Sequence, residues 1–331
     1  MAGAKNHKLT STPCLRNRVF CFLILVLAAA CAPSAAGGPT RAPSPAPTQS
    51  PISLTDGLNN TLVLEHPARR VVSLAPSNTE ILFAVGAGDQ VVGRDSISDY
   101  PDRAKTLSDV GGGFGAINTE RIVSLKPDLI LATEITPPDQ VTALQDLHLN
   151  VFYLKNPLSL DDMYHNLATV ARLVGHEAET DRLIQSLKAR VSAVTAKTST
   201  LQERPTVFYE LDSTDPNAPW TSGPGTFIDV LLTQAGGKNL GNSLGSAWGQ
   251  MSVEKLLTEN PDYILLGDFT YGGVTPQQVA ARPGWQKLGA VQAQRVFTFD
   301  DNLVSRPGPR LVDGLEALAK LLHPDLFKTT P

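Results

Sequence analysis

One sequence segment occurs twice in this chain, first at residues 118–131 and again at residues 252–265. In each copy a glutamate, Glu120 or Glu254, opens a short predicted helix, a Pro-Asp pair ends that helix, and an apolar strand follows. The two copies lie too far apart in the sequence to be neighbouring units of a solenoid. The repeat therefore predicts two similar lobes.

The remainder of the chain fits lobes of the α/β class. Its 331 residues, of which 42% are hydrophobic, are enough for two packed domains. Beyond Arg69, short apolar runs alternate with amphipathic stretches, beginning with a predicted strand at 71–74, a helix at 78–85 and a strand at 91–93. We expect two Rossmann-like lobes with mainly parallel sheets.

A long helical segment separates the two copies of the repeat. Residues 160–198 carry apolar side chains at helical spacing, with one break at Gly175. The second lobe is expected to open with a strand at 205–210 and to end with a helix at 309–322. The predicted division is a signal peptide at 1–30, a tether at 31–58, an N-terminal lobe at 59–175, a connecting helix at 176–200 and a C-terminal lobe at 201–331.

The first residues have the organisation of an export signal. A basic stretch ends at Arg18, an apolar run covers 19–27, and small residues precede Cys31. This order resembles a bacterial lipoprotein signal, in which Cys31 is lipidated, although Ala28 stands where Leu or Val is usual. The alternative is an ordinary signal peptide with an incidental cysteine. The Pro/Ser/Ala-rich residues that follow predict an extended tether.

Charge and cysteine content exclude several classes of protein. The formal net charge is −4, and the predicted signal peptide carries basic residues without acids, so cleavage leaves a more acidic chain without the basic surface that nucleic acid requires. Cys14 and Cys21 lie within that signal. Cys31 would be the only cysteine of the mature chain, which rules out an internal disulfide framework or a cysteine metal cluster.

Several motifs, taken together, resemble one family, the helical-backbone (class III) solute-binding proteins of ABC importers for cobalamin and ferric siderophores. The matching segments lie at 70–83, 98–101, 127–131, 221–229 and 305–315. The resemblance implies an extracytoplasmic, monomeric protein that captures its ligand between two lobes, closes only modestly, and delivers the ligand to a permease dimer with its ATPase subunits. It also implies that Glu120 and Glu254 dock on arginines of the permease. The alternative for each glutamate is a favourable acid in the first turn of a helix.

The same resemblance implies the positions of the ligand contacts. They are Pro76, Ser77, Asn78, Thr79, Asp99, Tyr100, Phe114, Trp220, Trp248 and Arg306. Aromatic faces suit a flat macrocycle, and an arginine or backbone N–H groups fix its polar rim. Each contact also has a structural alternative, such as a loop anchor for Phe114, a core position for Trp248 and a helix cap for Arg306.

The motifs at 76–80 and 98–101 look most like the cobalamin-binding branch, so we expect a corrinoid as the transported ligand and no covalently bound cofactor. A ferric siderophore or haem is the alternative, although binders of catecholate or hydroxamate siderophores often have a more basic cleft. Trp285 is expected on the surface of a short helix and contributes nothing to this site.

Three other classes of function fit the sequence less well. A free-metal binder would use His66, His148, His165, His176 and His323, but these lack metal-like spacing. An enzyme is disfavoured because the chain has no nucleophile elbow, Walker loop or dinucleotide fingerprint. A surface adhesin or ligand-sensing receptor on the same fold stays open, since fold does not fix function.

Overall fold

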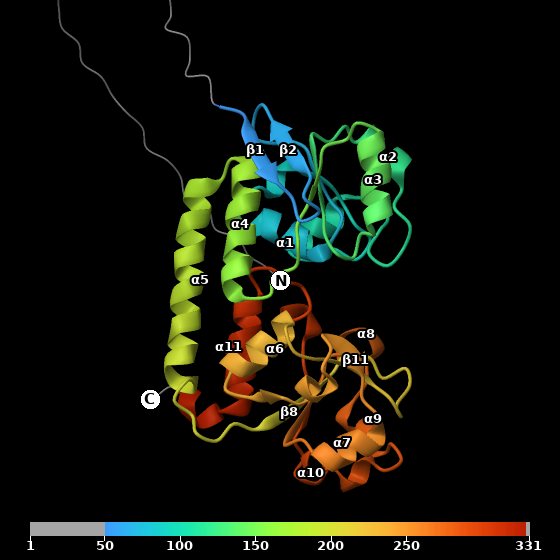
Figure 1. The fold of residues 1–331 in the computed structure, drawn as a ribbon, viewed down its shortest axis with the longest axis vertical. Coiled ribbons are helices and arrows are strands. Elements are labelled where there is room, and N and C mark those ends of the chain that lie inside the picture. The colour runs from blue at the N-terminus through green and yellow to red at the C-terminus, as the bar shows by residue number, and fades with distance from the viewer. Residues whose placement is uncertain (1–49, 329–331) are drawn as a thin grey trace, which may run out of the picture. The chain divides into compact units, whose positions relative to one another are not determined.

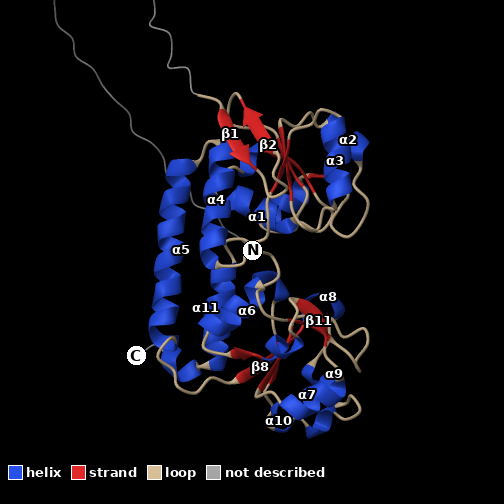
Figure 2. Cartoon of the chain, in the orientation of Figure 1, coloured by secondary structure: helices blue, strands red, loops and turns tan. Residues whose placement is uncertain are grey.

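Two parallel β-sheets follow one another along the chain in the computed structural model, which describes residues 50–328 (Figures 1 and 2). The predicted signal peptide, Cys31 and the first part of the predicted tether lie outside the described residues. Each sheet is covered by helices on both faces. The expected α/β class with mainly parallel sheets is confirmed.

The N-terminal lobe contains a five-stranded sheet of order β5-β4-β3-β6-β7, in which every pair of neighbours is parallel. An antiparallel hairpin, β1-β2, precedes it. The elements are β1 (Ile52–Thr55), β2 (Thr61–Leu64), β3 (Val71–Ser73), α1 (Pro76–Ala84), β4 (Val91–Arg94), β5 (Ser108–Asp109), α2 (Thr119–Ser124), β6 (Leu129–Ala132), α3 (Pro138–Asp146), β7 (Val151–Tyr153) and α4 (Leu160–Val174), with 3-10 turns at Gly88–Gln90 and Asp102–Thr106.

Successive residues of these strands enter different hydrophobic clusters. Val71 and Leu129 pack in the cluster that contains α1 and α4. Their neighbours Val72 and Ile130 pack in a cluster with residues of α2 and α3. Because adjacent side chains of a strand point to opposite faces, the sheet needs apolar helices on both sides, and its strands read as continuous apolar runs.

The C-terminal lobe has a four-stranded parallel sheet of order β10-β8-β12-β13 and a separate antiparallel ribbon, β9-β11. Its clusters divide in the same way, with Tyr209 on one face and Phe208 on the other. The elements are β8 (Thr206–Glu210), β9 (Trp220–Ser222), α6 (Phe227–Gln234), β10 (Lys238–Asn239), β11 (Trp248–Gln250), α7 (Val253–Glu259), β12 (Tyr263–Leu266), α8 (Phe269–Gly272), α9 (Pro276–Ala280), α10 (Gly289–Gln292), β13 (Val296–Thr298) and α11 (Leu311–Leu322), with 3-10 turns at Leu240–Leu244, Trp285–Lys287, Asp301–Leu303 and Pro324–Phe327.

A single helix, α5 (Glu177–Thr198), runs from one lobe to the other (Figure 1). Gly175 ends α4 in the left-handed conformation at φ 79°, which L side chains rarely adopt. At 1.5 Å per residue, α5 is about 33 Å long. Arg190 in its middle pairs with Asp313 at 2.5 Å and with Glu316 at 2.9 Å, so α5 is fixed to α11 by charge as well as by packing.

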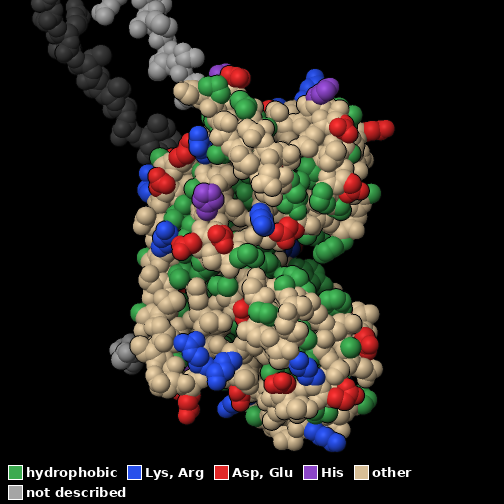
Figure 3. Space-filling view, in the orientation of Figure 1, with side chains coloured by type: hydrophobic (Ala, Val, Ile, Leu, Met, Phe, Trp, Pro, Cys, Tyr) green, Lys and Arg blue, Asp and Glu red, His purple; other side chains and the backbone are tan. Residues whose placement is uncertain are grey.

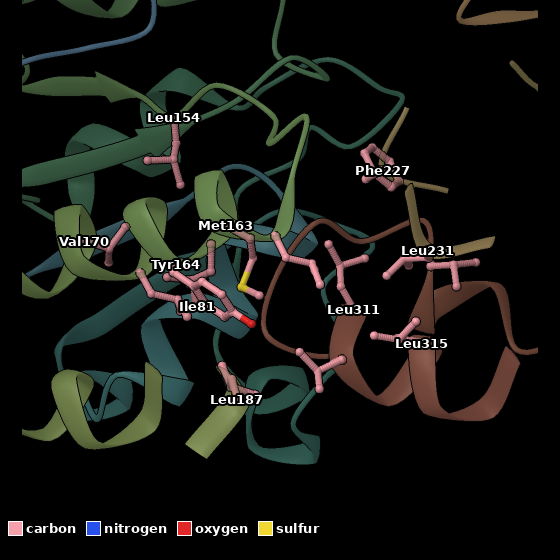
Figure 4. Close-up of a cluster of buried hydrophobic side chains, with 14 of the residues drawn as sticks. Ile81, Leu154, Met163, Tyr164, Val170, Leu187, Phe227, Leu231, Leu311 and Leu315 are labelled. Carbon is pink, nitrogen blue, oxygen red and sulfur yellow. The ribbon is translucent and has the colours of Figure 1, made fainter. Parts of the chain in front are cut away.

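One hydrophobic cluster is common to both lobes (Figure 4). Ile81 and Met163 come from the N-terminal lobe, Leu187 from α5, and Leu231 and Leu311 from the C-terminal lobe. Pulling the lobes apart would expose this apolar surface, at roughly 25 cal/mol for each Å². The shared core therefore favours small relative movements of the lobes.

The two copies of the repeat fold alike. Asn118 caps α2 by accepting from the Arg121 backbone N–H, and Ser252 caps α7 in the same way from Lys255. After each helix an aspartate bonds to backbone N–H groups at the start of the neighbouring strand: Asp128 accepts from Arg69 and Arg70, and Asp262 from Thr206. The predicted pairing of one short helix and one buried strand per lobe is thus found in both.

The predicted tether extends too far along the chain. The sequence predicts a tether at 31–58, but Ile52–Thr55 forms β1 and pairs with β2, with Ile52 opposite Leu64. Ile52 and Leu54 alternate with polar residues, a strand pattern that the neighbouring Pro- and Ser-rich sequence obscures. Among residues 50–328, no helix combines the length and the apolar character needed to cross a membrane.

Candidate functional site

The loops that follow the parallel strands of the two lobes meet across a cleft. Glu80 lies in α1 just after β3, Asp99 lies after β4, and Arg306 lies after β13 on the other lobe. Ion pairs join Arg306 to both acids, so the carboxyl ends of the two sheets face each other. Figure 3 shows the surface hollowed between the lobes, with hydrophobic side chains on the walls of the hollow. In open α/β sheets such an edge is the usual place for a ligand.

Five residues form the network at the base of this cleft. Arg310 donates to Glu80 from Nε at 2.8 Å and from Nη2 at 2.6 Å. Arg306 Nη1 lies 3.3 Å from Glu80 Oε1 and 2.5 Å from Asp99 Oδ1. The Arg310 guanidinium also lies over the Tyr100 ring, 4.0 Å from its centroid. The network therefore links both lobes and includes three predicted contacts, Asp99, Tyr100 and Arg306.

The charges of this network balance. Burial alone would lower the pKa of Arg306, but the hydrogen bond and the charge of Asp99 outweigh it and raise that pKa above its ordinary value. Arg310 behaves in the same way, with Glu80 outweighing burial. Two guanidinium groups therefore face two carboxylates. Arg306 does not cap the last helix, which begins at Leu311 after Arg310.

The predicted first loop, Pro76–Thr79, forms the buried first turn of α1. The Thr79 hydroxyl has no exposed surface and lies 2.7 Å from Ser73 Oγ and 2.8 Å from Ser98 Oγ, so it fastens α1 to the loop before Asp99. Neither polar atom of the Asn78 amide has a hydrogen-bond partner among the described residues. Asn78 is 1% exposed and Thr79 has no exposed surface, so neither predicted contact presents its side chain to the open cleft in this structure.

Three predicted aromatic contacts are exposed. The Phe114 side chain is 92% exposed, and Trp220 and Trp248 are each 44% exposed. The two tryptophans occupy the paired strands β9 and β11, and the Trp248 ring packs on Phe227 with centroids 5.9 Å apart. Trp248 is thus not a core residue. Large apolar faces on well-supported strands suit a flat ligand.

Two further aromatic residues were missed by the sequence reasoning. Phe269 and Tyr271 lie in α8, directly after the carboxyl end of β12, and Tyr271 is 68% exposed. The Tyr271 hydroxyl donates to Asn302 at 2.9 Å, which joins two loops of the C-terminal lobe. Both residues follow the carboxyl end of a buried apolar strand, as Asp99 and Tyr100 do. That position in the sequence is the signal that could have identified them.

The expected position of Trp285 is wrong. Its side chain is completely buried in the C-terminal lobe, although it does lie in a short 3-10 turn. It packs edge-on against Phe208 with centroids 6.4 Å apart, and the Arg282 guanidinium lies over its ring, 4.6 Å from the centroid. The second face of the sheet in this lobe needs a large apolar side chain to fill its core, and Trp285 supplies it.

The two glutamates to which the family resemblance assigns docking are accessible. Glu120 and Glu254 are both exposed and both lie in the first turn of their short helices. A backbone hydrogen bond and one from Ser252 lower the pKa of Glu254, so this carboxylate is charged at neutral pH. Each glutamate also suits the positive end of a helix, as the structural alternative requires.

A buried acidic group lies under the cleft in the C-terminal lobe. Glu210 ends β8 with no exposed surface, and Arg282 donates to both of its oxygens, at 2.6 and 2.9 Å. Asp268, which follows β12, accepts from Ser213 Oγ at 2.5 Å. Burial raises the pKa of Glu210 to about 7, against the lowering effect of Arg282 and with an added contribution from Asp268.

This shift makes the stability of the protein depend on pH. Because the folded chain binds the Glu210 proton more tightly than the unfolded chain, whose pKa is 4.5, the stabilising contribution is full below pH 4.5 and is lost as pH rises through about 7. We expect the unfolding temperature to fall across that window and the fall to be smaller in Glu210→Gln. Glu259→Gln, at an exposed position, should keep the wild-type slope. An equal slope in Glu210→Gln would contradict the assignment.

Within the described part of the chain, no group of three or more His, Cys, Asp or Glu side chains is placed to hold a metal ion. The charged groups of the cleft network are instead paired with one another. What this arrangement offers to a ligand is aromatic surface and a set of hydrogen-bonding groups of balanced charge.

Comparison with known proteins gives a consistent picture. A family model described as "Periplasmic binding protein" matches residues 71–303. The "Uncharacterized ABC transporter substrate-binding lipoprotein YvrC" of Bacillus subtilis (strain 168) is 35% identical over 84% of this chain and 87% of its own. A "Vitamin B12-binding protein" of Pectobacterium carotovorum is 32% identical over 74% of this chain and 84% of its own. Among solved structures, the periplasmic heme-binding protein RhuT from Roseiflexus sp. RS-1 superposes with a TM-score of 0.70 at 28% identity, covering 78% of this chain and 99% of that chain.

Proposed function

The chain belongs to the periplasmic binding protein family, and from this premise we propose that it is the solute-binding component of an ABC importer and carries a corrinoid in its interlobe cleft. The family expected from the sequence motifs is thereby confirmed. So is the expectation that the chain is not an enzyme, because the relatives described above are binding proteins.

The balanced charge of the cleft network supports a corrinoid over an anionic iron chelate as the ligand. Ferric catecholate chelates are polyanions and haem carries two carboxylates, so both favour cations that no protein carboxylate neutralises. Arg306 and Arg310 are already engaged by Asp99 and Glu80. A corrinoid instead presents a broad macrocycle with a rim of neutral amides.

The shape and polarity of the cleft also suit this ligand. Trp220, Trp248 and Phe114 offer exposed rings for contact with a broad macrocycle. The relative that is named a vitamin B12-binding protein supports the same choice.

Titration of the purified protein with cobalamin, cobinamide, haem and ferric siderophores tests this proposal. We expect saturable binding of the corrinoids and quenching of tryptophan fluorescence. The quenching should be weaker in Trp248→Phe, because this variant lacks one of the exposed tryptophans and keeps Trp285, which is buried away from the ligand. Calorimetry must confirm each hit, since coloured ligands attenuate the signal optically. Binding of an iron chelate alone would keep the importer role and overturn the choice of ligand. Absence of binding to all of them would favour a receptor that has lost the transport role.

We also propose that Glu120 and Glu254 dock the protein on its permease. Two equivalent carboxylates, one on each lobe, match a partner with two-fold symmetry, and exposed charges chiefly set register and association rate. In Glu120→Ala/Glu254→Ala we expect ligand affinity to be unchanged and ligand uptake by cells to fall by about tenfold or more. Glu177→Ala, at an exposed glutamate in the first turn of α5, is the matched control. Uptake at the wild-type rate in the double variant would exclude the docking role.

The location of the protein follows from the same proposal. We place it outside the cytoplasmic membrane, held by a lipid on Cys31 after removal of residues 1–30, as a monomer. Cys31→Ala should release the protein into the soluble extracytoplasmic fraction. Retention on membranes in that variant would indicate an uncleaved signal or another mode of attachment.

A further inference from the structure

A second concave site lies where three helices meet. A cavity of about 310 Å³, open to solvent on one side, is lined by the start of α4, the middle of α5 and the end of α6. None of the residues predicted to contact the ligand of the interlobe cleft lines this cavity. Because α4 belongs to the N-terminal lobe and α6 to the C-terminal lobe, an occupant would touch both lobes and the helix that joins them (Figure 1).

Two buried polar atoms in the lining have no partner. The hydroxyl of Tyr164 and the Oε1 atom of Gln234 both lack a hydrogen bond among the described residues, although both residues line the cavity. The Tyr164 side chain is 6% exposed, and its ring lies among buried apolar side chains beside Met163 (Figure 4). A buried polar atom without a partner is destabilising, so these two atoms favour an occupant that offers one acceptor and one donor.

Two charges of opposite sign stand at the rim. Lys188 of α5 places its ammonium 5.1 Å from the centre of the Tyr164 ring, and Asp161 lies one turn before Tyr164 on the same face of α4. Neither forms an ion pair with another described residue within 4 Å. Burial, and to a lesser extent the charge of Asp161, raise the pKa of Tyr164 to about 12, so its hydroxyl is a donor at neutral pH.

We propose that this cavity binds a small α-amino acid in its zwitterionic form, held by Tyr164, Lys188, Gln234 and Asp161. The carboxylate accepts from the Tyr164 hydroxyl and faces the Lys188 ammonium. The amino group donates to Gln234 Oε1 and faces Asp161. Leu160 and Val191, on neighbouring parts of the lining, provide apolar contact for a short side chain. The occupant would strengthen the junction between the lobes.

L-Alanine and three related compounds that each lack one of its groups test the roles assigned to the four side chains. Binding to the purified protein is measured by calorimetry, and the unfolding temperature is followed as ligand is added. We expect saturable binding of L-alanine and a rise in unfolding temperature. Propionate, ethylamine and lactate each lack one feature of the zwitterion and should bind at least about tenfold more weakly, since a lost charged hydrogen bond costs about that factor.

Tyr164→Phe separates a binding role from a structural one. Its missing hydroxyl has no partner in the unliganded protein, so the variant should fold with an unchanged or higher unfolding temperature and still bind L-alanine about tenfold more weakly. Tyr263→Phe, in the C-terminal lobe, is the matched control and should bind like the wild type. Lys188→Ala should weaken binding of L-alanine and of propionate alike.

Three results would overturn the proposal. The first is no binding of L-alanine to the wild-type protein at about 100 mM, which would mean that water alone fills the cavity. The second is equal binding of lactate and L-alanine, which would remove the role of the amino group. The third is equal affinity of Tyr164→Phe and the wild type. Affinity for the ligand of the interlobe cleft is a separate measurement, so failure here leaves the transport role intact.

Discussion

Replacing Glu80 by alanine is expected to lower the free energy of unfolding by about 3–5 kcal/mol, because it leaves the buried Arg306 and the mostly buried Arg310 without their shared carboxylate. Glu80 is 1% exposed and receives hydrogen bonds from both Arg306 and Arg310. The loss of one partner from a buried ion pair costs far more than the net contribution of the intact pair, since the remaining charges stay desolvated. Chemical denaturation monitored by circular dichroism measures the change.

The control for this experiment is Glu177→Ala, which removes a solvent-exposed glutamate and should change stability by less than about 0.5 kcal/mol. A more informative variant is Glu80→Leu/Arg306→Met/Arg310→Met, in which no unpaired charge is left among these three positions. We expect it to be more stable than Glu80→Ala. If Glu80→Ala unfolded at the same denaturant concentration as the wild type, the network would have no structural role.

The fold could be predicted from the sequence because its determinants are local. The repeat places one short helix and one buried strand in each lobe, and both α2-β6 and α7-β12 have this form. Gly175 separates α4 from α5 because the left-handed conformation there is one that glycine adopts without strain. Parallel sheets covered on both faces require continuous apolar strands, which are visible at 71–74 and 129–131.

Features that depend on packing across the chain could not be predicted in this way. The burial of Trp285 is decided by its packing against Phe208, which lies far from it in the sequence, and by the Arg282 guanidinium. The strand β1 is defined by its pairing with β2, while its own sequence follows a Pro-rich stretch. These contacts join residues that are distant in the sequence, so the local composition does not predict them.

The candidate site likewise contains residues that the sequence predicts and residues that only the assembled structure shows. The motif resemblance identified Asp99, Tyr100 and Arg306, and the structure brings these three together at one network. Glu80 was not among the predicted contacts, although an acid within the apolar turn that contains Ile81 and Leu82 signals a buried partner. Its partner Arg310 lies on the other lobe, so the pairing is visible only once the lobes are assembled.

Gly223→Ala is expected to disturb the ribbon that carries both exposed tryptophans and to destabilise the protein by about 3 kcal/mol. A Cβ atom at this position would lie 1.9 Å from the carbonyl oxygen of Ser246, which is backbone and cannot move by a change of rotamer. The Gly223 N–H also donates to the Ala247 carbonyl at 2.7 Å, directly before β11. Moving Ser246 away therefore breaks a hydrogen bond next to Trp248.

The consequence for function is weaker ligand binding, although Gly223 presents no side chain to the ligand. If Trp248 contacts the ligand as proposed, its displacement should lower ligand affinity by about tenfold. Gly225→Ala separates this effect from backbone strain, since Gly225 has a φ of +77° but nothing lies within 4 Å of the position that its Cβ atom would take. That variant should lose only about 1 kcal/mol and retain its affinity. Equal stability and equal affinity of the two variants would show that the ribbon accommodates the extra carbon and does not position the tryptophans.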